Sequence, residues 1–310
     1  MINQIKGLHH VTSMAADANE NNAYFTNTLG LRRVKKTVNF DAPEVYHLYY
    51  GDEVGTPGSV MTYFPFGKMP RGTRGVGEVG DTEFAVPTGS LSYWKDRLPQ
   101  HGVTGLSEET AFGEDRLRFD GPDGDGFALV ESEARGRAPW TGTDVPKDAG
   151  ILGFHGARFR LKDAAATGEL LEFMGYQKAE TQGDITRYIV EGGNAADTID
   201  LDALPGGPSA HQGAGSVHHI AFAVEDRAAQ LEVRQALLDT GYQVTPVIDR
   251  DYFWAIYFRT PGGVLFEIAT NEPGFDRDED TANLGQALKL PTRYEPYRDQ
   301  IEQRLPAING

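Results

Sequence analysis

The sequence has no cysteine among its 310 residues, and this absence excludes several kinds of chemistry. Disulfides, iron–sulfur clusters, thiolate metal sites and a cysteine nucleophile all need that side chain. Any metal must therefore be held by nitrogen and oxygen ligands, which suits Fe(II), Mn(II), Zn(II), Ni(II) or Mg(II).

Long apolar runs are also missing. The hydrophobic stretches are of strand length, whereas a membrane-spanning helix needs about 20 apolar residues. The opening segment, MINQIKGLHHVT, has neither the apolar core nor the small-residue cleavage site of a signal peptide. We therefore expect no membrane partner and a cytoplasmic location.

Positive charge is scarce. The 29 Lys and Arg are outnumbered by 45 Asp and Glu, which leaves a formal net charge of −16. Phosphate backbones and anionic membranes are bound by clustered Lys and Arg, so we expect no nucleic-acid partner. The acidic surface is interpreted as a solubilising one.

A fourfold repeat organises what is present. Each copy has a short strand pattern, a helix with a glycine near its end, and two or three further strand patterns. The predicted helices cover residues 18–29, 90–100, 164–174 and 227–240. The predicted strands cover residues 7–14, 31–40, 45–51 and 59–64; 79–86, 106–112, 116–120 and 127–131; 152–161 and onward to about 201; and 216–224, 242–248, 254–259 and 264–270.

One copy of about 55 residues offers a single helix on a small sheet whose other face stays uncovered. Pairing two copies buries that face and encloses a cavity, which predicts an α+β fold of four βαβββ modules paired into two half-barrels. We expect modules one and two in residues 1–135, a linker at 136–150, modules three and four in 151–272, and a surface-wrapping tail at 273–310. The sequence does not decide between a monomer and a homo-oligomer.

Copies one and four begin alike, with LHHVT at residues 8–12 and VHHIA at 217–221. Copy four ends in the strand pattern GGVLFEIAT, in which Glu267 projects from the face opposite Phe266 and Ile268. A carboxylate inside an apolar strand is costly to bury unless a cation accompanies it. The pattern therefore favours a metal site.

Strand alternation allows only one histidine of each pair to face the cavity. The first of each pair shares its face with the apolar residues that follow, so His9 and His218 should point away, and His10 and His219 inward. With Glu267, the inward pair would leave about half of an octahedral shell open for substrate and O₂.

Copies two and three lack this set. Their openings read Asp81-Thr82-Glu83 and His155-Gly156, and Ala128 falls where copy four has Glu267. We therefore expect one metal site per chain, formed if copy one pairs with copy four, and a metal-free second half-barrel.

The four βαβββ units, with LHHVT, VHHIAF and GGVLFEIAT, resemble the vicinal oxygen chelate superfamily over nearly the whole chain. This superfamily includes glyoxalase I, bleomycin-resistance proteins and type I extradiol dioxygenases. The pattern is most similar to ring-cleaving dioxygenases that act on hydroquinones, including chlorinated ones.

The resemblance implies that His10, His219 and Glu267 are ligands of Fe(II), with Mn(II) as an alternative metal. It implies a small aromatic substrate, hydroquinone-like or catechol-like, and O₂ as reaction partners. Tyr257 matches an active-site tyrosine that contacts substrate or its oxygenated intermediates, and Arg250 matches an arginine of the pocket rim.

The resemblance also implies supporting roles at three further positions. His9, Thr12 and His218 match second-sphere or acid–base groups of the family. Strand alternation argues against direct substrate contact by the first and last of these, unless a bulge re-aims them.

Four aromatic residues are candidates for the lining of an apolar pocket or for ordinary core: Tyr46, Tyr49, Phe253 and Trp254.

Two other functions stay open. A glyoxalase-type isomerase, lyase or thiol transferase would use a second carboxylate, but the copy-one equivalent of Glu267 is about Thr62. A ligand-sequestering protein of the same fold would need no metal triad.

Overall fold

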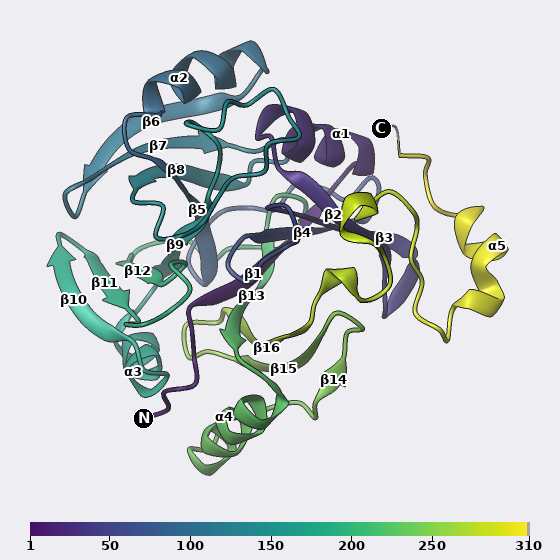
Figure 1. Cartoon of the computed structure of the whole chain (residues 1–310). Coiled ribbons are helices and arrows are strands. Elements are labelled where there is room, and N and C mark those ends of the chain that lie inside the picture. The colour runs from purple at the N-terminus through teal and green to yellow at the C-terminus, as the bar shows by residue number, and fades with distance from the viewer. Residues whose placement is uncertain (309–310) are drawn as a thin grey trace.

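Two eight-stranded sheets, each curved into a half-barrel, form the computed structural model, which describes residues 1–308 (Figure 1). The strand order is β14-β15-β16-β13-β1-β4-β3-β2 in the first sheet and β10-β11-β12-β9-β5-β8-β7-β6 in the second. The first sheet thus joins module one to module four, and the second joins module two to module three. This arrangement confirms the predicted α+β fold of paired βαβββ modules.

Modules one and four have closely matched elements. Module one contains β1 (Leu8–Ala15), α1 (Ala18–Ala23), the π-helix η1 (Tyr24–Thr28), β2 (Arg32–Asn39), β3 (Ala42–Gly51) and β4 (Val60–Pro65). Module four contains β13 (Val217–Val224), α4 (Arg227–Asp239), β14 (Ile248–Asp249), β15 (Phe253–Arg259) and β16 (Leu265–Pro273).

Modules two and three repeat the pattern. Module two contains β5 (Glu78–Pro87), α2 (Leu91–Gln100), β6 (Thr104–Ala111), β7 (Glu114–Asp120) and β8 (Gly126–Ser132). Module three contains β9 (Gly153–Leu161), α3 (Ala165–Phe173), β10 (Gln177–Gln182), β11 (Ile185–Ile189) and β12 (Thr198–Ala203). Residues 133–152, between the two modules, hold no helix or strand. The predicted domain boundaries themselves stay a prediction.

Two predicted elements differ in the structure. The helix expected over residues 18–29 is an α-helix only to Ala23, and it continues as a π-helix in which the Leu29 amide donates to the Tyr24 carbonyl at 3.0 Å. The strand expected over 242–248 is wrong except at its last residue. In that segment the Thr245 amide donates to the Tyr257 carbonyl of β15 at 3.1 Å, but the Thr245 carbonyl accepts from the Arg234 side chain, so no strand ladder is formed.

The register of the first sheet aligns its two modules. Thr12 lies opposite Thr62 where β1 pairs with β4, and Ala221 lies opposite Glu267 where β13 pairs with β16. Thr62 is therefore the module-one equivalent of Glu267, as the sequence predicted.

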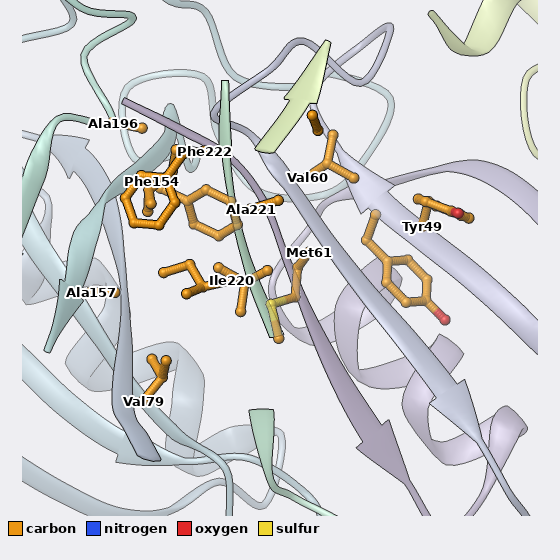
Figure 2. Packing of buried hydrophobic residues seen from close by; sticks show 14 of the residues in the cluster. Tyr49, Val60, Met61, Val79, Phe154, Ala157, Ala196, Ile220, Ala221 and Phe222 are labelled. Atoms are coloured by element: carbon orange, nitrogen blue, oxygen red, sulfur yellow. The ribbon is translucent and has the colours of Figure 1, made fainter. Parts of the chain in front are cut away.

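The apolar core lies between the two sheets. Figure 2 shows Ile220 and Phe222 of β13 beside Phe154 and Val79 of the second sheet. Both β13 residues are fully buried. Because side chains alternate along a strand, this packing sends the intervening residues of β13 to the other face of their sheet.

The tail after β16 lies over module one (Figure 1). It contains η2 (Phe275–Arg277), η3 (Thr281–Asn283), η4 (Glu295–Tyr297) and α5 (Arg298–Glu302). The ammonium of Lys35, fully buried on β2, contacts Asp278 at 2.6 Å and Glu279 at 2.5 Å. Within residues 1–308, no helix has the length and apolar character needed to cross a bilayer.

Ion pairs fill the centre of the second sheet. Asp200 lies opposite Arg158 where β12 pairs with β9, so it is the module-three equivalent of Glu267. Its carboxylate accepts two hydrogen bonds from Arg187, both at 2.8 Å. Arg116, also fully buried, donates to Glu83 at 2.8 Å. A guanidinium thus balances the buried carboxylate in this half of the molecule.

Replacing Arg116 by methionine should lower the free energy of unfolding by about 3–5 kcal/mol, because buried Glu83 would lose its hydrogen-bonded counter-charge and keep only Arg158, whose Nε lies 4.0 Å away. Urea denaturation followed by circular dichroism measures this change. The control is Lys95→Met, which removes an exposed ion pair with Glu108 and should cost less than about 1 kcal/mol. Equal losses in the two variants would contradict the buried network.

Candidate metal centre

Three side chains from adjacent strands of the first sheet meet at one point. His10 comes from β1, His219 from β13 and Glu267 from β16. The Nε2 atoms of the two histidines are 3.4 Å apart, and they lie 3.4 Å and 2.9 Å from Glu267 Oε2. The three form a cluster whose ligand atoms could hold one metal ion.

This cluster fits a divalent cation. Two ligands at right angles, each about 2.1 Å from a metal, are about 3 Å apart, close to the observed spacings. Glu267 is fully buried, and neither of its carboxylate oxygens has a hydrogen-bond partner among the described residues. Burial raises the pKa of Glu267, but His10 and His219 outweigh it and hold that pKa well below 4.5. An ionised carboxylate in such a place calls for a cation.

His9 supports His10 from behind. A register shift in β1 between Leu8 and His10 re-aims the ring, so that the Nδ1 atoms of the two histidines are 2.9 Å apart. Burial lowers the pKa of His9 to about 3, so its ring is neutral. One tautomer assignment satisfies every contact: His10 donates from Nδ1 to His9, and His9 donates from Nε2 to the Thr270 carbonyl at 3.1 Å. This leaves His10 Nε2 free for a metal.

His218 contacts His219 in the same way as His9 contacts His10, but the His218 ring also lines the cavity. Its Nδ1 lies 2.8 Å from that of His219, and burial lowers its pKa to about 4. Unlike His9, it is only half-buried and lines the cavity beside the cluster. Strand alternation predicted that His218 points away from the cavity, and this was wrong. For His9 the prediction agrees with the structure, because His9 does not line the cavity.

A cavity of about 300 Å³ opens in front of the cluster. It is lined by His10, Asn39, Phe40, Asp41, His47, Tyr49, Phe64, Phe66, His218, His219, Arg250, Phe253, Tyr257, Leu265 and Glu267. Aromatic rings make up much of this wall, so the cavity suits a flat, apolar ring that carries polar substituents.

The four aromatic candidates divide evenly. Tyr49 and Phe253 line the cavity, whereas Tyr46 and Trp254 do not. The hydroxyl of Tyr46 donates to the Pro306 carbonyl in the tail, and the ring of Trp254 lies under a surface arginine.

Tyr257 and Arg250 form one side of the cavity. Tyr257 lies directly opposite Glu267 where β15 pairs with β16, and its hydroxyl accepts from Arg250 Nε at 3.2 Å. Burial, and then the negative charge of Glu267, raise the pKa of Tyr257 well above 10. Arg250 also contacts Asp41 at 3.2 Å, across the mouth of the cavity.

Thr12 is fully buried and does not line the cavity. Its hydroxyl is 2.8 Å from that of Thr62, which is 2.8 Å from His47 Nε2. This series of hydrogen bonds ends at Tyr49, whose hydroxyl is 2.7 Å from His47 Nδ1. The sequence pattern did not predict a role for His47, although its position two residues before Tyr49 on one strand face could have indicated it.

Comparison with known proteins shows the family of this chain. The model of the Glyoxalase/Bleomycin resistance protein/Dioxygenase superfamily matches residues 159–268. MhqO of Bacillus subtilis (strain 168), named a ring-cleaving dioxygenase, is 43% identical over 306 residues, which cover 98% of this chain and 97% of that protein. The chain belongs to this superfamily. The predicted resemblance to the vicinal oxygen chelate proteins is thus confirmed.

Further members of the superfamily share the whole length of the chain. A chlorohydroquinone/hydroquinone 1,2-dioxygenase of Sphingobium indicum is 36% identical over 310 residues, covering 96% of this chain and 95% of its own. The crystal structure of a Bacillus subtilis protein described as a dioxygenase superimposes with a TM-score of 0.95, at 42% identity and over 99% of this chain and 98% of its own. This superfamily member is therefore an enzyme, a ring-cleaving dioxygenase.

Replacing Glu267 by glutamine should lower metal occupancy by orders of magnitude, because the only anionic ligand of the cluster becomes neutral. Elemental analysis after dialysis, with circular dichroism to verify the fold, measures the effect. The control is Glu225→Gln, the same substitution at an exposed position of module four. Full retention of metal by the Glu267 variant would show that this carboxylate is not a ligand.

Proposed function

We propose that the protein is a non-haem Fe(II)-dependent, extradiol-type dioxygenase that cleaves the ring of a hydroquinone-like or catechol-like aromatic, with Mn(II) as an alternative metal. The observation that carries this proposal is the cluster of His10, His219 and Glu267 at one end of an aromatic cavity. The dioxygenase class of the chain supports it.

The ligand set suits redox chemistry with O₂. Two neutral imidazoles and one carboxylate leave a bound Fe(II) with open positions and a low net charge, so that it can bring O₂ and the aromatic together and change oxidation state. Without cysteine, no thiolate competes for the ion.

The side chains around the cavity can each take a separate role in binding the substrate or in proton transfer. Phe253 lies with its ring centroid 4.9 Å from that of His10, where it can pack against a substrate ring. Arg250 and the Tyr257 hydroxyl can hold an anionic oxygen of substrate or product. Because Nδ1 of His218 accepts from His219, the neutral ring of His218 carries its proton on Nε2, where it can donate to an oxygen of substrate or product.

The substrate class rests on the relatives and on the cavity. One relative is named for chlorohydroquinone and hydroquinone, and at 36% identity it aligns with almost the full chain. The aromatic lining of the cavity, whose volume is about 300 Å³, suits a single ring of this kind. A small dihydroxylated aromatic is therefore the proposed substrate.

Metal analysis of anaerobically purified protein, followed by oxygen-electrode assays with hydroquinone, methylhydroquinone and catechol, tests the proposal. We expect about one iron or manganese per chain and O₂ uptake that depends on the aromatic. Zinc or nickel without O₂ uptake would move the protein to the isomerase or transferase branch. Absence of any metal would overturn the role of the cluster.

Replacing Tyr257 by phenylalanine should leave metal content unchanged and slow turnover by about 10²-fold, because the hydroxyl beside Glu267 and Arg250 is lost. Steady-state O₂ uptake at saturating substrate measures this. Tyr242→Phe, in the same module but outside the cavity, is the matched control. An unchanged rate in the Tyr257 variant would remove that residue from the reaction.

A further inference from the structure

The cavity contains a second tyrosine that is the repeat-equivalent of Tyr257. In module four, Tyr257 lies opposite Glu267 where β15 pairs with β16. In module one, Tyr49 lies opposite Thr62 where β3 pairs with β4. Since Thr62 is the equivalent of Glu267, Tyr49 is the equivalent of Tyr257. Both tyrosines line the same cavity.

The two tyrosines face the cavity from opposite sides. In the strand order, β15 and β3 are separated by β16, β13, β1 and β4, and the curvature of the sheet brings its two ends toward each other. The ion pair between Arg250 and Asp41, 3.2 Å long, joins the loop before β15 to the turn before β3. A ligand in the cavity therefore lies between a module-one wall and a module-four wall.

The partners of the two tyrosines differ in charge. Tyr257 receives a hydrogen bond from the guanidinium of Arg250. Tyr49 has instead the imidazole of His47, at 2.7 Å, and His47 Nε2 lies 2.8 Å from the Thr62 hydroxyl. The His47–Tyr49 part of the module-one wall is thus built of neutral groups, whereas the module-four wall carries Arg250 and Glu267; the carboxylate of Asp41, also in module one, is paired with Arg250.

The hydrogen-bonded series Thr62–His47–Tyr49 leaves one hydrogen-bonding position of Tyr49 unused. Burial lowers the pKa of His47 well below 6.5, so its ring is neutral, with one nitrogen that donates and one that accepts. If Tyr49 donates to His47 Nδ1, its oxygen can still accept a hydrogen bond. If His47 Nδ1 donates to Tyr49, the phenol proton is free. In both cases the unused position belongs to a side chain of the cavity wall.

We propose that the His47–Tyr49 pair determines substrate specificity by binding the hydroxyl of a 1,4-dihydroxybenzene that does not reach the metal cluster. This inference rests on the proposed function. The two hydroxyls of a catechol are adjacent, so both can approach the cluster. The two hydroxyls of a hydroquinone lie on opposite sides of the ring, so the second needs a partner on the far wall.

The groups around Tyr257 and those around Tyr49 match the two ends of such a ligand. An oxygen that ionises at the cluster is compensated by the metal and by Arg250. A second hydroxyl that stays protonated is best bound by neutral groups, because an added charge near a buried hydroxyl would have to be desolvated. His47 and Tyr49 supply a neutral donor and acceptor at that position.

Anaerobic calorimetric titration of the metal-loaded protein with hydroquinone, catechol and phenol tests the inference. The wild type should bind hydroquinone about tenfold more tightly than phenol, the effect of one ordinary hydrogen bond. Tyr49→Phe should abolish this preference while leaving phenol affinity within about twofold. His47→Gln, which can still reach Thr62 but not Tyr49, should reduce the preference as well.

Tyr46→Phe is the matched control, because Tyr46 lies on the same strand but bonds to the tail outside the cavity. It should keep the wild-type preference. Equal weakening of hydroquinone and phenol by Tyr49→Phe would show a structural role only and overturn the inference, as would an unchanged preference.

O₂ uptake on the same samples separates this inference from the proposed function. If the wild type consumes O₂ with hydroquinone but Tyr49→Phe keeps the preference, the inference is wrong and the function stands. If the wild type binds hydroquinone in preference to phenol through Tyr49 without O₂ uptake, the proposed function is wrong and the binding role stands. Failure to bind any of the three aromatics would overturn both.

Discussion

The antiparallel pairing of β1 with β13 is the constraint on which the site depends. It places Thr12 opposite His219 and His10 opposite Ala221, so that one histidine from each end of the chain enters the same concave face. The parallel pairing of β13 with β16 then adds Glu267. Neither half of the chain holds the cluster alone, so burial of the carboxylate is linked to the joining of modules one and four.

The two half-barrels differ in what balances the charge of a buried carboxylate. Each has a buried carboxylate at equivalent positions of the repeat, Glu267 in module four and Asp200 in module three. Asp200 receives two charge-assisted hydrogen bonds from Arg187 and is thereby satisfied within the protein. The nitrogens nearest Glu267 among the described residues are the Nε2 atoms of His10 and His219, and neither oxygen of its carboxylate is satisfied by them. The same fold can therefore close a site with arginine or keep it open for a cation.

The sequence predicted the repeat, the pairing of modules and the clustered residues. The alternation along strands and the two matched His-His pairs can be recognised even when the predicted ends of the strands are wrong by a few residues. The sequence could not predict the register shift that turns His9 toward His10, since a bulge leaves no pattern in the residues. For the same reason His218 was placed on the wrong face. His47 was missed because its role depends on Thr62, 15 residues away in sequence.

The C-terminal tail, residues 274–308, supports one wall of the cavity in the first half-barrel. Phe40 lines the cavity, and its carbonyl accepts hydrogen bonds from Tyr294 at 2.7 Å and from Arg293 at 3.1 Å. The residues behind this wall thus lie some 250 positions away in the chain, as the 254-residue separation of Tyr294 and Phe40 shows. Chimaeras between relatives would need to exchange module one and the tail as a single unit, because the tail holds from behind a wall of the cavity that module one supplies.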